Sequence, residues 1–210
     1  MELSEKEVLR YLGYHDKTPD KRILSLINHI KAELNECVNQ KSACEITDCL
    51  IDGASVTMGC LKIQSEDLSK HLTGCRKTAL FAATLGAGAD TLIRRYSAAD
   101  MEKAVIAQAI CTAMIEAYCD EIESKIASMA MAEELFLTAR FSPGYGDFNV
   151  IYQQDLLHLL DCGKRIGLTL TEGYMLIPVK SVIAVIGLTE HQNCDIEKCN
   201  GCDKDCEFRR

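Results

Sequence analysis

Two short stretches of the sequence carry residue types that can do chemistry. In Arg140-Phe141-Ser142-Pro143-Gly144-Tyr145-Gly146-Asp147, a guanidinium, a hydroxyl, a phenol and a carboxylate surround a Pro-Gly pair. Proline presets φ to about −65° and glycine tolerates positive φ, so Pro143-Gly144 predicts a tight turn. A turn needs none of these polar side chains. The stretch is therefore a candidate ligand-binding loop, with a solvated surface loop as the alternative.

The second stretch lies in the last seventeen residues and holds four of the twelve cysteines: Cys194, Cys199, Cys202 and Cys206. Four thiolates form the ligand set of an iron–sulfur cluster or of tetrahedral zinc. The first three cysteines have the x4, x2 spacing of plant-type ferredoxins, whereas zinc sites more often combine two Cys-x2-Cys pairs. We expect these cysteines to hold an iron–sulfur cluster, with zinc or metal-free redox thiols as alternatives.

Composition excludes several classes of protein. The chain has 210 residues, of which 48% are hydrophobic and 26% charged, as is usual for a globular domain. Its net charge of −8 argues against binding the phosphate backbone of nucleic acids. No apolar stretch is long enough to span a membrane, and no secretory signal is visible. We expect a cytoplasmic protein with one domain over residues 1–190 and a cysteine-rich tail over residues 191–210.

Capping signals and apolar periodicity predict five helices. The longest is expected over Ala98–Met129, opened by a capping box at Ser97. Glu116 lies at the edge of its apolar face, where a carboxylate is costly unless it is paired. The other four are expected at Ser4 to Gly13, after Thr18-Pro19, after Ser65 and at Gln154–Leu160. His71 is predicted to be a cation at a helix end.

Strands are predicted around a hairpin turn at Asp52-Gly53, in the apolar run Lys77–Leu85, and in three segments after Ile166. The Gly86–Asp90 segment after the apolar run resembles a nucleotide-cradling loop, but a lone Gly-x-Gly more often marks a tight connection. Helices and strands do not alternate regularly. The predicted fold class is α+β, with helices around a mainly antiparallel twisted sheet.

Three blocks occur in an order that resembles a known family. Arg140-x-x-Pro143-Gly144-Tyr145 is followed by a helix, then by Leu170-Thr171-Glu172, then by Ser181-Val182. This order is similar to that of the S-adenosylmethionine-binding activation domain of vitamin B12-dependent methionine synthase. The resemblance covers the chain from the helix that holds Glu116 to Leu188. It implies a C-shaped α+β domain with a shallow groove for the ligand.

The resemblance also implies roles for single residues. Glu116 would pair with the ligand's ammonium group and Arg140 with its carboxylate. Backbone groups around Ser142 and Gly144 would meet the adenine or ribose, and Tyr145 would place its ring near the sulfonium. The sequence departs from the family in three places. Gly146-Asp147-Phe148 follows the tyrosine, where the family has more small and proline residues, and the segment between the long helix and Arg140 is short. After the Ser181-Val182 block, the cysteine tail stands where the family continues its sheet.

The function implied by the resemblance is the reactivation of cobalamin. The protein would bind S-adenosylmethionine and serve a cobalamin-binding methionine synthase or related corrinoid protein, with flavodoxin or ferredoxin as electron donor. No nucleophile or acid–base set is visible among the five histidines, so the protein is not expected to be a self-sufficient enzyme. Two alternatives are a small-molecule S-adenosylmethionine-dependent methyltransferase and an iron–sulfur electron-transfer module.

Overall fold

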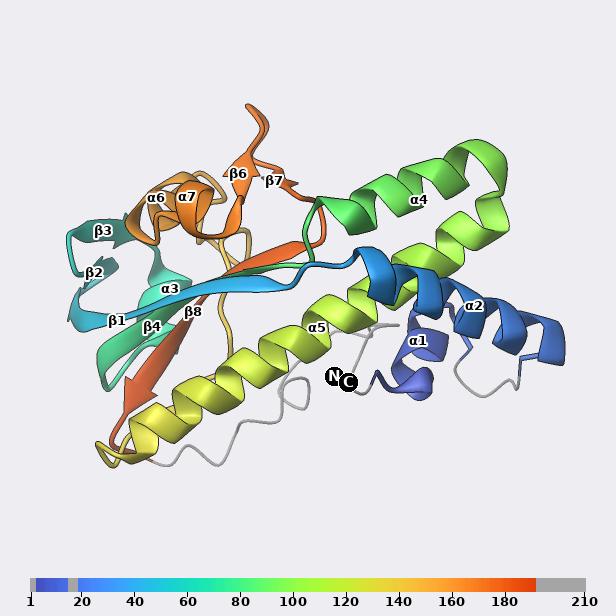
Figure 1. Cartoon of the computed structure of the whole chain (residues 1–210). Helices are drawn as coiled ribbons and strands as arrows, with labels where there is room; N and C mark the ends of the chain where they lie inside the picture. The colour runs from blue at the N-terminus through green and yellow to red at the C-terminus, as the bar shows by residue number, and fades with distance from the viewer. Residues whose placement is uncertain (1–2, 15–18, 192–210) are drawn as a thin grey trace.

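A computed structural model of the chain describes residues 3–14 and 19–191. A six-stranded antiparallel sheet forms its centre, in the order β3-β2-β1-β4-β8-β5 (Figure 1). Two further short strands form a separate hairpin, β6-β7. The strands are β1 (Lys41–Asp52), β2 (Ser55–Met58), β3 (Leu61–Gln64), β4 (Cys75–Thr84), β5 (Phe136–Leu137), β6 (Thr169–Leu170), β7 (Leu176–Ile177) and β8 (Ser181–Thr189).

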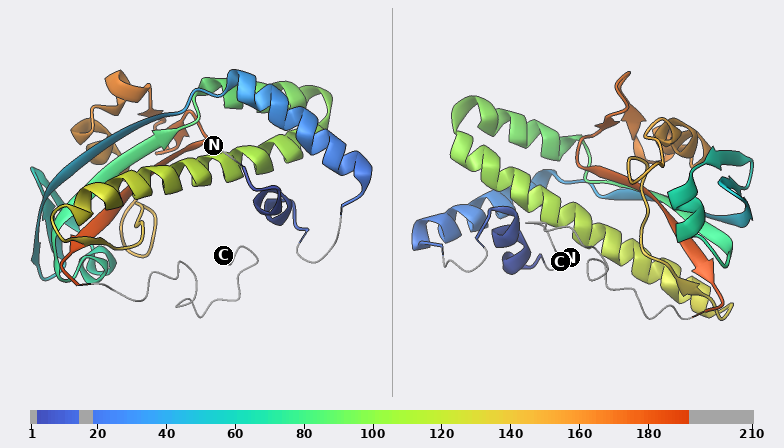
Figure 2. Two further views of the ribbon diagram at one scale, coloured as in Figure 1. Left: turned by 60° about the horizontal axis from the view of Figure 1, so that its bottom comes forward. Right: turned by 180° about the vertical axis from the view of Figure 1, so that it is seen from behind.

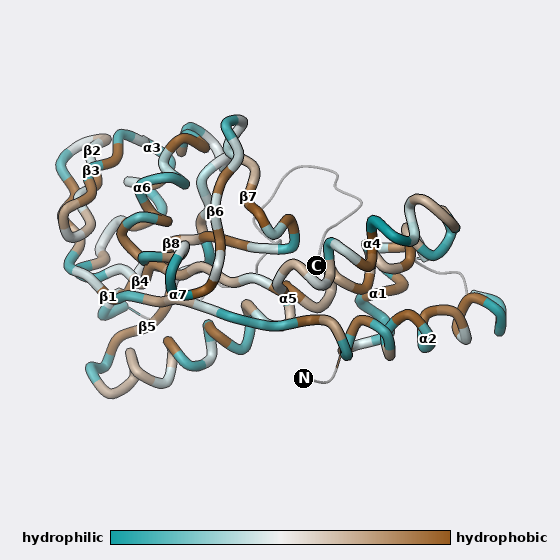
Figure 3. The backbone as a smooth tube through the Cα atoms, turned by 45° about the horizontal axis from the view of Figure 1, so that its top comes forward, coloured by the Kyte–Doolittle hydropathy of each residue, from teal (hydrophilic) through white to brown (hydrophobic). Residues whose placement is uncertain are grey.

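Strands β4 and β8 pair along their whole length and are buried on both faces. In β4, Phe81 belongs to the hydrophobic cluster on one face, and its neighbours Leu80 and Ala82 belong to the cluster on the other. A strand covered on both sides reads as a continuous apolar run instead of an alternating pattern. Figure 3 shows this for β8, which is coloured hydrophobic along most of its length.

Four helices pack into the cluster on one face of the sheet: α1 (Glu5–Tyr11), α2 (Lys21–Cys37), α4 (Ala87–Ala99) and α5 (Met101–Met131). Helix α5 runs diagonally along the sheet and continues beyond it, where α2 and α4 pack against it (Figures 1 and 2). The opposite face is covered by α3 (Glu66–His71), α6 (Tyr152–Leu159) and α7 (Cys162–Ile166). Small residues such as Ala107, Ala109 and Ala113 let α5 lie close to its neighbours.

The structure moves two predicted helix starts and keeps a third without its predicted cap hydrogen bond. Asp100, and not Ser97, caps α5, because its side chain accepts a hydrogen bond from the backbone N–H of Lys103 and α4 continues to Ala99. Asp20 caps α2 in the same way, whereas Thr18 lies outside the described residues. Ser4 precedes α1, but its side chain makes no cap hydrogen bond.

The predicted class and most predicted elements are confirmed. Two strands are additional: β3, which forms a second hairpin through Gly59 at φ +58°, and β5, which is only two residues long. The helix expected at Gln154–Leu160 begins at Tyr152, and a short helix that was not predicted follows it from Cys162. Within residues 3–14 and 19–191, no helix has the length and apolar character that crossing a bilayer requires.

Candidate functional site

The Pro143-Gly144 pair forms the predicted turn. The N–H of Tyr145 donates to the carbonyl of Ser142 at 3.0 Å, and Gly144 has φ +100°. This is the hydrogen bond of a β-turn, with glycine at the position that requires positive φ. Pro143 is buried, while Gly144 and Tyr145 are exposed. The turn therefore presents its glycine backbone and a phenol ring, 57% exposed, to solvent.

The residues just before the turn are fixed to the sheet. Phe141 pairs with Val185 of β8 through two backbone hydrogen bonds of 2.9 Å, and its ring stacks on His71 at 4.8 Å between centroids. Nε2 of His71 lies 2.8 Å from the carbonyl oxygen of Ala139. Burial lowers the pKa of His71, although this hydrogen bond opposes the shift. His71 is therefore a neutral packing residue near neutral pH, and the prediction of a helix-end cation was wrong.

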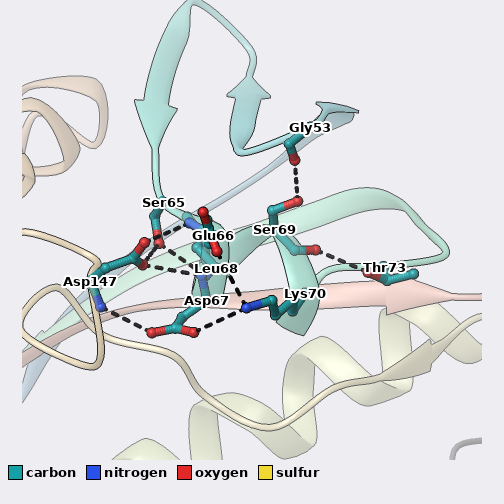
Figure 4. Close-up of polar contacts among 9 residues, drawn as sticks. All are labelled: Gly53, Ser65, Glu66, Asp67, Leu68, Ser69, Lys70, Thr73 and Asp147. Carbon is teal, nitrogen blue, oxygen red and sulfur yellow. Dashed lines mark hydrogen bonds and ion pairs between the residues drawn. The ribbon is translucent and has the colours of Figure 1, made fainter.

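The residues after the turn are fixed to the start of α3 (Figure 4). The carboxylate of Asp147 accepts hydrogen bonds from the hydroxyl of Ser65 and from the N–H groups of Glu66 (2.7 Å) and Asp67 (3.1 Å). Asp67 in turn accepts from the N–H of Asp147. The Ser65 hydroxyl, followed by these N–H groups, lowers the pKa of Asp147. Asp147 therefore positions the loop, a role that its place in the sequence did not reveal.

Arg140 lies among three carboxylates of α5. Its Nη2 is 3.1 Å from both Glu116 Oε2 and Asp120 Oδ1, and its Nε forms an ion pair with Glu123. The three acids are four and three residues apart, so they share one face of the helix. Burial lowers the pKa of Arg140, but the carboxylates, led by Glu123, outweigh that effect and raise it. The arginine side chain is 12% exposed.

The structure thus brings Glu116 and Arg140 into direct contact and places Ser142, Gly144 and Tyr145 on the adjoining turn. One guanidinium against three carboxylates leaves a formal charge of −2, so this part of α5 favours a cation. Sequence analysis identified Glu116 but missed Asp120 and Glu123. Their spacing from Glu116 on the helix was the available signal.

Residues 68–205 match the family described as "Vitamin B12 dependent methionine synthase, activation domain". This match spans well over half of the chain. The chain belongs to this family. The resemblance drawn from the three sequence blocks is confirmed.

A solved structure described as the "MetH Reactivation Domain bound to AdoHcy" has the same fold as this activation-domain family member. The TM-score is 0.64, with 14% sequence identity over 90% of this chain and 75% of the other. No curated protein matches the chain.

Elsewhere in the activation domain, the Gly86–Asp90 segment is a tight connection, as predicted. A Cβ on Gly88 would lie 2.0 Å from the carbonyl oxygen of Cys37, so glycine is needed for α4 to approach α2. Oδ2 of Asp90 accepts a hydrogen bond from the N–H of Val179 at 2.7 Å. The segment therefore serves helix packing and the connection to β8.

The Leu170-Thr171-Glu172 block forms the turn of the β6-β7 hairpin. Both the N–H and the side-chain oxygen of Thr171 bond to Met175, across the turn. The hairpin also borders an open cavity of about 440 Å³, lined by Gln154, Leu157, His158, Gly163, Leu168, Thr169, Leu170, Thr171, Glu172 and Tyr174. The bonds of Thr171 therefore stabilise the hairpin turn itself.

The described part of the activation domain contains no cluster of His, Cys, Asp and Glu that could hold a metal. The proposed ligands Cys194, Cys199, Cys202 and Cys206 lie outside the described residues. The other eight cysteines are unpaired thiols, and burial raises the pKa of Cys111 and Cys119 to about 12. These two buried thiols stay protonated and act as small apolar residues.

Proposed function

We propose that this chain binds S-adenosylmethionine at the Arg140–Asp147 loop and the adjoining face of α5, and presents its methyl group to cobalamin. The single observation that carries the proposal is the contact between Glu116 and Arg140 beside the turn that exposes Gly144 and Tyr145. Membership of the activation-domain family and the AdoHcy bound by a protein of the same fold support this choice of ligand.

The charge of the site suits this ligand. S-adenosylmethionine carries two positive groups, an ammonium and a sulfonium, and one carboxylate. The excess of carboxylates on α5 favours the positive groups. Glu116 is the proposed acceptor for the ammonium, and the exposed ring of Tyr145 is the proposed cation–π partner of the sulfonium. Backbone groups at Ser142 and Gly144 would bond to the adenine or ribose.

Cobalamin supplies the reaction chemistry. Transfer of a methyl cation from the sulfonium to Co(II), together with one electron, gives methylcobalamin and leaves S-adenosylhomocysteine. The residues of this chain then have to bind and orient the methyl donor, which lowers the entropic cost of the encounter. The partner is a cobalamin-binding methionine synthase or related corrinoid protein. A flavodoxin or ferredoxin would deliver the electron.

A small-molecule methyltransferase is the second candidate, and the structure weakens its main support. That reading relied on Gly86–Asp90 as a nucleotide loop, yet Gly88 packs against Cys37 and Asp90 is bonded to Val179. The deciding experiment measures methyl transfer anaerobically with a Co(II)-cobalamin protein and a reductant. The loss of the Co(II) electron paramagnetic resonance signal should require S-adenosylmethionine and this chain together. Steady formation of S-adenosylhomocysteine with a small-molecule acceptor and no corrinoid would favour the second candidate.

The four tail cysteines support a separate proposal, based on their spacing alone. An iron–sulfur cluster at Cys194, Cys199, Cys202 and Cys206 could pass the electron that Co(II) needs. The test is anaerobic purification followed by visible absorption and metal analysis. A colourless protein with stoichiometric zinc and no iron or labile sulfide would exclude electron transfer by the tail and leave the methyl-donor proposal intact.

A further inference from the structure

Lys180, which the sequence analysis did not single out, lies against the same helix as the candidate site. Its Nζ donates hydrogen bonds to Oγ1 of Thr112 at 3.0 Å and to the carbonyl oxygen of Gln108 at 3.4 Å. Thr112 precedes Glu116 by four residues, so both side chains belong to one face of α5. Lys180 and the Arg140 cluster therefore lie next to each other along the helix.

The Lys180 ammonium forms no ion pair with any carboxylate in the part of the chain that the structure describes. Asp90 is the carboxylate whose charge raises the pKa of Lys180. Its Oδ2 accepts a hydrogen bond from the N–H of Val179. Burial lowers the pKa of Lys180, which Cys111 and Asp90 only partly oppose. The partners of the ammonium are a hydroxyl and a carbonyl oxygen, which leave its positive charge uncompensated and available to an anion.

The distance along α5 fits an α-amino acid. Four residues of helix rise about 6 Å, which separates the Lys180 contact at Thr112 from Glu116 by about one turn. An α-ammonium and an α-carboxylate are attached to the same carbon. Their opposite partners on a protein must therefore lie a few ångströms apart. Arg140 suits the carboxylate less well, because three α5 acids already surround it.

The edge of β8 between these residues lacks a strand partner in the part of the chain that the structure describes. On its outer side β8 pairs with Phe136 and Leu137 near its end and with Phe141 at Val185. No described strand pairs with this side between Ser181 and Ala184. Backbone groups point outward at alternate residues, and Val185 is one of these, so Ile183 is the next. Its outward N–H and C=O have no strand partner among the described residues, although Ile183 itself is only 3% exposed.

We propose that Lys180 and Glu116 hold the amino-acid end of the ligand, with Lys180 on the α-carboxylate and Glu116 on the α-ammonium. The inference rests on the proposed function and adds a residue that makes the site selective for a carboxylate-bearing ligand. Lys180 is a binding residue here, because its ammonium would touch the ligand directly. Arg140 then orients Glu116 and its neighbouring acids.

The test compares S-adenosylmethionine with its decarboxylated form, which keeps the ammonium and the sulfonium. Calorimetry on the wild-type chain should show about ten-fold weaker binding of the decarboxylated form, the usual size of one charge-assisted hydrogen bond. Lys180→Met should weaken S-adenosylmethionine about ten-fold and leave the decarboxylated form unchanged. Glu116→Gln should weaken both. Lys180→Arg should restore most of the preference for the carboxylate.

Lys164→Met is the matched control, since this lysine on α7 is 86% exposed and far along the chain from α5. Melting temperatures of all variants identify a loss of folding. Equal binding by Lys180→Met and the wild type, or an equal loss for both ligands, would overturn the inference while the proposed function stands. Absence of S-adenosylmethionine binding by the wild-type chain would overturn the proposed function and the inference together.

Discussion

The carboxylate of Asp147 accepts a hydrogen bond from the hydroxyl of Ser65, a residue 82 positions earlier in the chain. The same hydroxyl accepts from the N–H of Leu68 and so caps α3. One buried serine therefore joins a helix start to the loop that carries the candidate site. The hydrogen bonds of Ser65 with Asp147 and Leu68 therefore position the exposed turn at Gly144 without any contribution from a ligand.

Ser65→Ala should destabilise the protein by about 0.5–2 kcal/mol, the usual cost of losing a helix cap. It should also weaken ligand binding, because Asp147 loses a partner. Urea denaturation measures the first effect and calorimetry the second. Ser128→Ala is the control, since its exposed hydroxyl bonds only within α5. Similar small changes in both variants would show that Ser65 does not position the loop.

Acid should destabilise the protein through His71. Burial lowers its folded-state pKa below the unfolded value of about 6.5. The unfolded chain then binds a proton that the folded chain does not. This contribution to stability is present above pH of about 6.5 and is lost as the pH falls toward the folded pKa, by at most about 1.4 kcal/mol per pH unit. His71→Gln can still donate to Ala139 but does not titrate. Its unfolding free energy should vary less between pH 7.5 and 5.5 than that of the wild type, and an unchanged slope would contradict the prediction.

Gly88→Ala should destabilise the protein by about 1–3 kcal/mol. Its Cβ would overlap the backbone carbonyl of Cys37, so α2 and α4 would have to separate. Gly163→Ala in α7 is the control, because its Cβ meets nothing within 4 Å and its φ is not positive. That change should be neutral or stabilise by up to about 1 kcal/mol. Thermal unfolding of the two variants side by side gives the comparison, and equal melting temperatures would refute the packing role of Gly88.

Local signals made much of the fold predictable. The apolar run that became β4, the Asp52-Gly53 turn and the Pro143-Gly144 turn depend on neighbouring residues in the chain. The short strand β5 could not be found in this way, because two residues give no periodicity and its pairing partner lies about fifty residues later. The start of α5 was misplaced because both Ser97 and Asp100 are good caps, and only packing decides between them.

The residues of the candidate site were predictable in part, but the contacts between them were not. The sequence pointed to Glu116 and Arg140 through the family resemblance, but it could not show that they touch each other. It also could not show that Asp147 turns toward α3 or that Lys180 reaches α5. The contacts of Asp147 and Lys180 join residues 68 to 82 positions apart, and they depend on how the loops cross the sheet.

Although Arg140 lies in a loop, its removal should destabilise the fold, because the side chain forms ion pairs with three acids of α5. Arg140→Met would leave Glu116, Asp120 and Glu123 on one helix face without their shared cation. Breaking a buried ion pair costs about 3–5 kcal/mol. Since Glu116 and Asp120 are partly exposed and screened by water, we expect a smaller loss of about 2 kcal/mol. Chemical denaturation measures this value.

The double variant Arg140→Met/Glu123→Gln separates repulsion from lost packing. Glu123 is the least exposed of the three acids, at 17%. Its charge should therefore cost the most stability when the arginine is removed. Removing that charge should recover part of the stability lost in Arg140→Met, whereas Glu123→Gln alone should destabilise. The two single effects would then sum to more than the double effect. Additive effects would mean that Arg140 stabilises α5 through its packing alone, and that the acids do not depend on it for charge compensation.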